Sequence, residues 1–281
     1  TLAFLNHMPI IAGPVVSFDP KHVPEWLYVW QHDYDTIRDL LYEHVKKVMA
    51  RYRNVVSLWN VVSGLYVNGR FGFNVEQLMD LTRMAVVLTK QIQPNAKTLI
   101  EITHPFGEYH ADNPASLPPL TYAEMAIQAG IPFDGFGLKL LMGENAPGRY
   151  TRDLLQLSGL LDRFLNLGKP VHVTAVAVPS DRVEPKEESD QAPETNGKCP
   201  GGYWRKPWST SVQGRWLEAF YSIAFSKPVV ESVAWLDLAD HKNAEIPHGG
   251  LLKSDLEPKK AFQRLSTMRK NFQDQENGNG R

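Results

Sequence analysis

The strongest constraint on the fold is a repeated alternation of short apolar runs with longer runs of helical periodicity. Six apolar, β-branched-rich runs lie at residues 10–17, 55–62, 98–103, 133–141, 171–178 and 229–238. They recur roughly every 40 residues, which is the length of one strand–helix unit with its loops. Strands that are apolar along their whole length belong to parallel sheets whose outer face is covered. The sequence therefore predicts an α/β fold built on a parallel sheet.

Helix signals stand between these runs. Residues 35–53 carry apolar side chains along one helical face. Three polar residues are each followed at the third position by Gln or Glu, the spacing of a helix N-cap and its partner. The three pairs are Asn74 with Gln77, Thr121 with Glu124, and Thr210 with Gln213.

Counting units alone does not choose the sheet topology. A closed (β/α)8 barrel needs eight strand–helix units, whereas an open doubly wound sheet accommodates six. No G-x-G-x-x-G motif follows the first apolar run, which weakens a nucleotide-binding hypothesis.

Composition narrows the functional classes. The 281 residues carry a formal net charge of −1, which gives no support for a nucleic-acid partner. No apolar run approaches the roughly 20 residues of a membrane span. The single cysteine, Cys199, excludes an internal disulfide.

Six motifs in chain order carry a resemblance to one known family. They are Gly13–Leu27, Ser57–Gly64 (S-L-W-N-V-V-S-G), Ala129–Leu141, Lys169–Val178, Val233–Asp240 and Gly250–Leu265. Together they resemble the strand signatures of glycoside hydrolase family 10, the endo-β-1,4-xylanases. The resemblance implies a (β/α)8 TIM barrel whose third to eighth strands lie in this chain. We expect the barrel over residues 1–270 and a polar tail over 271–281.

The same resemblance implies that the barrel is incomplete within these residues. The first two strands are expected upstream of Thr1. Open edges of apolar parallel strands are an aggregation hazard. We therefore expect the upstream segment, or another chain, to complete the barrel.

The resemblance also locates the catalytic pair. The family needs two carboxyl groups, an acid/base at the end of strand four and a nucleophile at the end of strand seven. The matching positions in this sequence are Gly64 and Ala175, and neither side chain can transfer a proton or attack a sugar. Family positions around them have changed too, to Lys139, Leu141 and Ala177 among others. This predicts a catalytically impaired barrel.

Two alternatives remain open. Glu101, together with Asp237 or Asp240, stands at predicted strand ends and could supply relocated carboxylates for an active glycosidase on a β-linked polysaccharide. A barrel with no ligand, used only for protein contacts, is the second alternative.

Aromatic residues favour sugar binding, because flat sugar faces stack on exposed rings. The predicted ligand-binding residues are Trp59, Asn60, Lys139, Trp204, Trp208 and Trp235. The long loop over residues 180–209 is interpreted as a lid. We therefore predict a non-catalytic carbohydrate-binding or scaffold module of a larger protein, which the resemblance makes extracytoplasmic or secreted.

Histidines in loops raise the question of a metal. His104, His110 and Asp112 cluster in one loop, and His241, Glu245 and His248 in another, but neither spacing fits a known metal-binding pattern. His172, within an apolar strand, is interpreted as a core histidine. We predict no metal and no cofactor.

Overall fold

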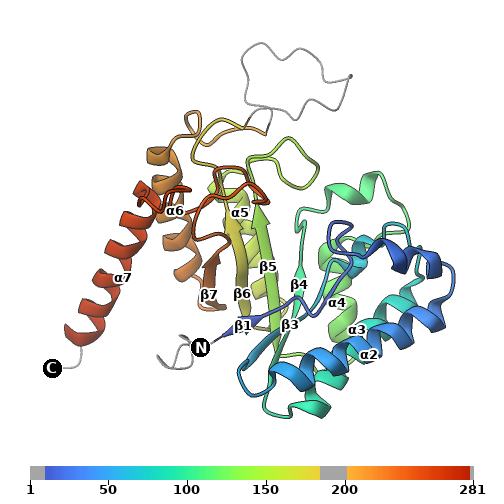
Figure 1. Cartoon of the computed structure of the whole chain (residues 1–281). Helices are drawn as coiled ribbons and strands as arrows, with labels where there is room; N and C mark the ends of the chain where they lie inside the picture. The colour runs from blue at the N-terminus through green and yellow to red at the C-terminus, as the bar shows by residue number, and fades with distance from the viewer. Residues whose placement is uncertain (1–9, 184–200, 279–281) are drawn as a thin grey trace, which may run out of the picture. The chain divides into compact units, whose positions relative to one another are not determined.

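The computed structural model describes residues 10–183 and 201–278 (Figure 1). The chain divides into two compact units. The first unit comprises residues up to Lys139 together with Leu167–His172, and the second comprises Leu140–Asn166 and the chain from Val173 onward. Within the described ranges, no helix is both long and apolar enough to cross a membrane.

The first unit is built on a parallel sheet. Its strands are β1 (Ile11–Ala12), β2 (Val16–Ser17), β3 (Leu58–Ser63), β4 (Lys97–Ile102) and the start of β5 (Gly135–Leu141). They pair in the order β1-β3-β4-β5, and β2 also pairs with β3. The register places Ser63 beside Glu101 and Glu101 beside Gly137. Three residues from three strands therefore form one row, at the carboxyl ends of β3 and β4 and near the middle of β5.

The prediction of one continuous strand over residues 10–17 is wrong. The backbone at Gly13 approaches β3 so closely that a Cβ there would lie 2.2 Å from the Asn60 carbonyl oxygen. Pro14 has no N–H to donate to a ladder. Pairing resumes where the Val15 N–H donates to the Asn60 oxygen at 2.9 Å. The run is consequently split into β1 and β2, both held by β3.

Helices join the strands of the first unit. They are η1 (Glu25–Trp30), α2 (Tyr34–Tyr52), η2 (Leu65–Val67), α3 (Val75–Ile92), η3 (Glu108–Ala111) and α4 (Pro119–Gln128). The predicted cap at Asn74 is confirmed, with a reciprocal capping box to Gln77. The predicted cap at Thr121 is wrong: α4 begins at Pro119, since proline suits the first turn of a helix, where its missing N–H is not needed.

The second unit carries the end of β5, then α5 (Leu154–Leu165), most of β6 (Val171–Ala177), α6 (Thr210–Phe225), β7 (Val230–Trp235) and α7 (Lys260–Gly278). Backbone bonds from Met142 N–H to the Ala177 oxygen and from Leu236 N–H to the Val176 oxygen place β6 between β5 and β7. Ser209, not Thr210, caps α6. Helix α7 continues through most of the stretch expected as a polar tail.

Asp134, just before β5, ties α3 and β4 to that strand. Its carboxylate accepts hydrogen bonds from Lys90 at 2.7 Å and from the N–H and hydroxyl of Thr98 at 2.7 and 2.9 Å. Burial alone would raise the pKa of Asp134, but these hydrogen bonds outweigh it and hold the pKa below its usual value. The ionised carboxylate thus stabilises the folded chain.

An Asp134→Asn variant tests this contribution. A lowered folded-state pKa gives stability that is present above the unfolded pKa and lost as pH falls through the folded one. We expect the variant to lose ~1 kcal/mol at pH 7, because hydrogen bonds to a charge are strong but this side chain is partly exposed. Urea unfolding should show the deficit at pH 7 and its loss at a pH well below the ordinary Asp pKa of about 3.9. An equal deficit at both pH values would contradict the assignment.

Candidate functional site

Gly64, the position that the family resemblance assigns to the acid/base, lies in the first unit directly after β3. Gly64 adopts a left-handed conformation with φ of 69° and caps η2. A Cβ at this position would lie 3.2 Å from the Cγ2 of Thr103. Residues other than glycine are strained in this conformation. The local backbone is therefore shaped for glycine.

A buried carboxylate stands beside this position. The Ser63 hydroxyl donates to the Oε2 of Glu101 at 2.5 Å, and both residues are buried. Next to them the Tyr66 hydroxyl donates to the Thr103 carbonyl oxygen. Burial raises the pKa of Tyr66 well above its ordinary value, so the phenol is a neutral donor here. Glu101 thus belongs to a compact polar layer at the carboxyl end of β3 and β4.

The other predicted residues of the first unit differ in their surroundings. Trp59 is only 2% exposed, and its Nε1 donates to the Oε1 of Gln93 on α3 at 2.9 Å. Its ring packs in the core. Asn60 is buried, and no described residue donates to its Oδ1. Lys139 is half-buried near the end of β5.

Ala175, the position that the family resemblance assigns to the nucleophile, lies in the second unit on β6. Ala175 and Ala177 are buried in an apolar cluster with Leu141 and Ile246, and Leu236 packs against it. Ile246, which is fully buried, comes from the segment between β7 and α7. That segment therefore covers Ala175, to which the family resemblance assigns the nucleophile. Sequence reasoning missed Ile246, because a lone apolar residue in a loop carries no pattern.

Arg149 anchors the segment that carries Ile246. Its guanidinium binds the Oε2 atoms of Glu144 at 3.0 Å and Glu245 at 2.8 Å, and it also donates to the Glu245 carbonyl oxygen at 2.9 Å. Arg149 is buried, and Glu245 immediately precedes Ile246. The loop after β5 is thereby fastened to the loop that covers Ala175.

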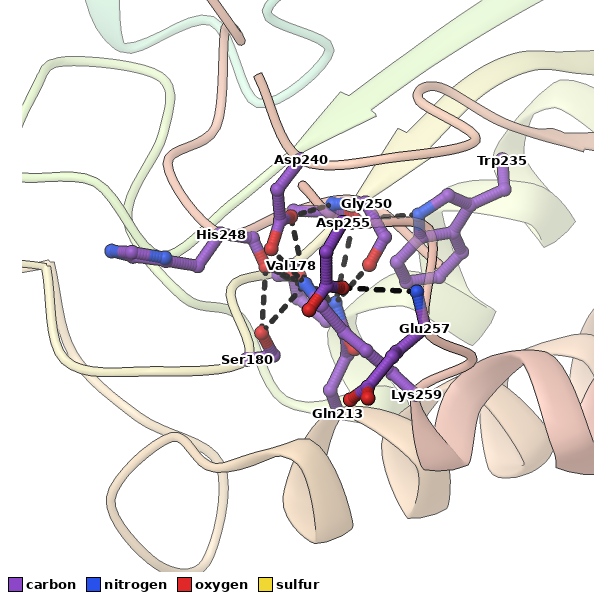
Figure 2. A network of polar contacts seen from close by, with 11 residues as sticks. Val178, Ser180, Gln213, Trp235, Asp240, His248, Gly250, Asp255, Glu257 and Lys259 are labelled. Carbon is purple, nitrogen blue, oxygen red and sulfur yellow. Dashed lines mark hydrogen bonds and ion pairs between the residues drawn. The ribbon is translucent and has the colours of Figure 1, made fainter. Parts of the chain in front are cut away.

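A buried lysine forms a second anchor (Figure 2). The Lys259 ammonium lies 2.6 Å from the Oδ2 of Asp240 and donates to the Ser180 hydroxyl at 2.9 Å and the His248 oxygen at 3.1 Å. The other carboxylate oxygen of Asp240 also accepts from the Gly250 N–H at 2.9 Å. Both oxygens of Asp240, a candidate relocated carboxylate, therefore already have partners within this network.

Asp237 is the remaining candidate carboxylate of the second unit. Its Oδ1 lies 3.2 Å from the Nε2 of His241. Its Oδ2 is buried and has no hydrogen-bond partner among the residues that the structure describes. One oxygen of Asp237 is therefore available for a further polar contact.

The predicted aromatic residues of the second unit fall into two groups. Trp208 is buried, with its Nε1 donating to the Gly202 oxygen, and the Nε1 of Trp235 donates to the Gly249 oxygen. Tyr203 is 51% exposed, and half-buried Trp204 carries the Arg205 guanidinium 4.6 Å from its ring centre. The segment is anchored by Thr151, whose N–H and hydroxyl both donate to the Gly201 oxygen. The lid prediction for residues 184–200, including Cys199, lies outside the described residues.

The sequence raises the question of a metal centre at the two histidine clusters. Within the described ranges, no three His, Cys, Asp or Glu side chains come together as a metal site. His172 is buried on β6.

Comparison with known proteins assigns the family. The sequence profile of "Glycosyl hydrolase family 10" matches residues 20–200, more than half of the chain. The chain belongs to glycosyl hydrolase family 10. A curated relative of this family-10 chain is Endo-1,4-beta-xylanase B of Neocallimastix patriciarum, 22% identical over 168 residues. That match covers 56% of this chain and 18% of the relative's length.

Solved structures agree on the fold of the family-10 chain. Native xylanase 10B from Thermotoga maritima matches with a TM-score of 0.66 and 15% identity, over 97% of this chain and 78% of that one. A thermostable xylanase mutant (Xyn10A) from Cellvibrio japonicus matches with a TM-score of 0.64 and 16% identity, over 95% and 80%. The predicted fold is confirmed: the parallel strands are part of a family-10 TIM barrel.

Proposed function

We propose that this chain is a catalytically impaired family-10 barrel that binds a polysaccharide without cleaving it. The observation that carries the proposal is the apolar cluster around Ala175, closed by Ile246. A nucleophilic carboxylate has to be ionised, and burial among apolar side chains penalises the charged form. Gly64 offers no acid/base in the first unit.

Binding is proposed at the exposed aromatic segment Tyr203–Arg205. An exposed ring offers an apolar face to a sugar, and a neighbouring cation can donate hydrogen bonds to its hydroxyl groups. Arg205 stands over Trp204, and Tyr203 is half exposed beside it. The segment is anchored to Thr151, in the loop after β5. Barrel enzymes place substrates at the carboxyl ends of their strands, which favours this location.

Affinity electrophoresis in gels that contain soluble xylan, β-glucan or mannan tests the proposal. We expect one of these polymers to retard the wild-type chain. Trp204→Ala should weaken retardation about tenfold in apparent Kd, or ~1.4 kcal/mol. Trp26→Ala, which removes an exposed tryptophan of the first unit, is the matched control and should change nothing. Unretarded wild type, or equal retardation of Trp204→Ala, would contradict binding at this segment.

A second candidate is an active glycosidase with relocated carboxylates. In the first unit the buried Glu101 at the carboxyl end of β4 offers one carboxyl group, and in the second unit Asp237, with one oxygen that lacks a described partner, offers another. Hydrolysis of a glycosidic bond requires one proton donor and one base or nucleophile, and two carboxyl groups can supply both roles. Release of reducing sugar from a β-linked polysaccharide tests this second candidate.

The role of the chain in a larger assembly is also a proposal. We infer that it serves as a scaffold or binding module of an extracytoplasmic protein. The family assignment supports this inference, because polysaccharides are too large to enter a cell and are therefore bound outside it.

A further inference from the structure

The stretch from Gly201 to Trp208 carries positive charge without negative charge. Its charged residues are Arg205 and Lys206, and both side chains are exposed. Within the described ranges, neither of them forms an ion pair with a carboxylate. Exposed cations without an anionic neighbour can donate charge-assisted hydrogen bonds to an anionic ligand.

A tight turn places Arg205 over the neighbouring ring. The Lys206 N–H donates to the Trp204 oxygen at 2.7 Å, so Arg205 is the central residue of a turn closed across it. Its φ is 60°, in the left-handed region that favours glycine. The guanidinium lies 4.6 Å from the ring centre of Trp204. An arginine kept where the backbone favours glycine points to a function of its side chain.

The backbone on both sides of this turn is held in place. Before the turn, the Gly201 oxygen accepts hydrogen bonds from the N–H and the hydroxyl of Thr151, each at 2.9 Å. After the turn, the buried ring of Trp208 donates from its Nε1 to the Gly202 oxygen at 3.1 Å. Ordering of loops and side chains is part of the free energy that binding costs. The fixed flanks lower that cost for a ligand of this segment.

We propose that residues 203–206 recognise the carboxylate of a uronic acid within a polysaccharide. The Arg205 guanidinium donates two parallel N–H bonds to the carboxylate, Lys206 adds a second positive charge, and the sugar ring lies against the exposed Tyr203. A planar guanidinium matches a carboxylate in this two-point geometry, and it also stacks on aromatic faces, as Arg205 does on Trp204. The inference rests on the proposed sugar binding at the same segment and names the chemical class of the sugar.

Affinity electrophoresis at about 0.15 M salt, where exposed charges more than about 8 Å apart are screened, tests the proposal. The gels contain polygalacturonate, whose backbone is uronate, or glucuronoxylan, which carries uronate branches, each beside the same polymer with its carboxyl groups reduced to alcohols. We expect the wild-type chain to bind at least one acidic polymer about fivefold more tightly than its reduced form. The polymer that shows this preference distinguishes a backbone uronate from a branch.

Three variants locate the preference. Arg205→Gln should abolish it, because the side chain loses both its charge and its paired donors. Arg205→Lys keeps the charge without the planar fork and should keep only part of the preference. Arg215→Gln is the matched control, since it removes an exposed arginine of α6 outside the segment, and it should leave the preference unchanged.

Three results would overturn the proposal. Equal binding of the acidic and the reduced polymers by the wild type would exclude carboxylate recognition, while the proposed sugar binding would stand. A preference that survives Arg205→Gln, or that Arg215→Gln lowers as much, would show that this segment does not produce it. Absence of binding to every polymer, the reduced forms included, would contradict the proposed sugar binding as well.

Discussion

Replacing Ala175 by glutamate, the residue that the family resemblance expects at this position, should unfold the second unit or cost it about 3–5 kcal/mol. Ala175 is 6% exposed among Leu141, Ala177 and Ile246, so the new carboxylate would enter an apolar cluster with no partner. Urea unfolding at pH 7 measures the loss. Burial raises the pKa of such a carboxyl, so its penalty should shrink as pH falls and the group becomes neutral.

Ala175→Gln separates charge from size. Glutamine has the shape of glutamate without its charge, so we expect a smaller loss that does not vary between pH 4 and pH 7. An Ala175→Glu variant as stable as the wild type at pH 7 would show that the cluster opens to water. The proposal that Ile246 seals the nucleophile position would then fail.

Lys259→Met should produce a second large effect. The substitution leaves Asp240 without its cation and removes the lysine hydrogen bonds to the Ser180 hydroxyl and the His248 oxygen, which keeps the Ser180 N–H and hydroxyl as donors. Removing one partner of a buried ion pair typically costs about 3–5 kcal/mol. Thermal or urea unfolding should show a loss of this size.

Lys253→Met provides the control for Lys259→Met. Lys253 pairs with Glu257 on the surface, where both side chains are more than half exposed. Exposed pairs contribute about 0–1 kcal/mol, so this variant should stay close to the wild type. Adding Asp240→Asn to Lys259→Met should recover part of the stability, because the orphaned charge is removed. A Lys259→Met loss no larger than that of Lys253→Met would contradict the anchoring role.

The six strand runs could be predicted because each is a short, continuous apolar stretch, and all six contain strand in the structure. Boundaries were less accurate. The break at Gly13 depends on contact with Asn60, which lies 47 residues away and leaves no local signal. The cap of α4 was misplaced at Thr121 because Pro119 can begin a helix without a side-chain cap.

Site residues on or next to strands could be placed from the sequence, whereas the contacts that loops make could not. The family resemblance pointed to Gly64, which follows β3, and to Ala175 on β6, and their assignment as catalytic positions stays a prediction. Strand-end logic singled out Glu101 and Asp240. Nothing in the sequence paired Asp240 with Lys259, 19 residues later, or placed Ile246 over Ala175. Such contacts depend on loop paths, and loop paths follow from tertiary packing more than from local pattern.

Whether the chain cleaves polysaccharides is measured by reducing-sugar release from xylan and other β-linked polysaccharides, with the wild-type chain beside Glu101→Gln and Asp237→Asn. We predict no release above the blank from any of the three, while the wild type still binds its polysaccharide in the gel. Release by the wild type that is abolished by Glu101→Gln or Asp237→Asn, with folding intact, would contradict this prediction and establish a glycosidase with relocated carboxylates.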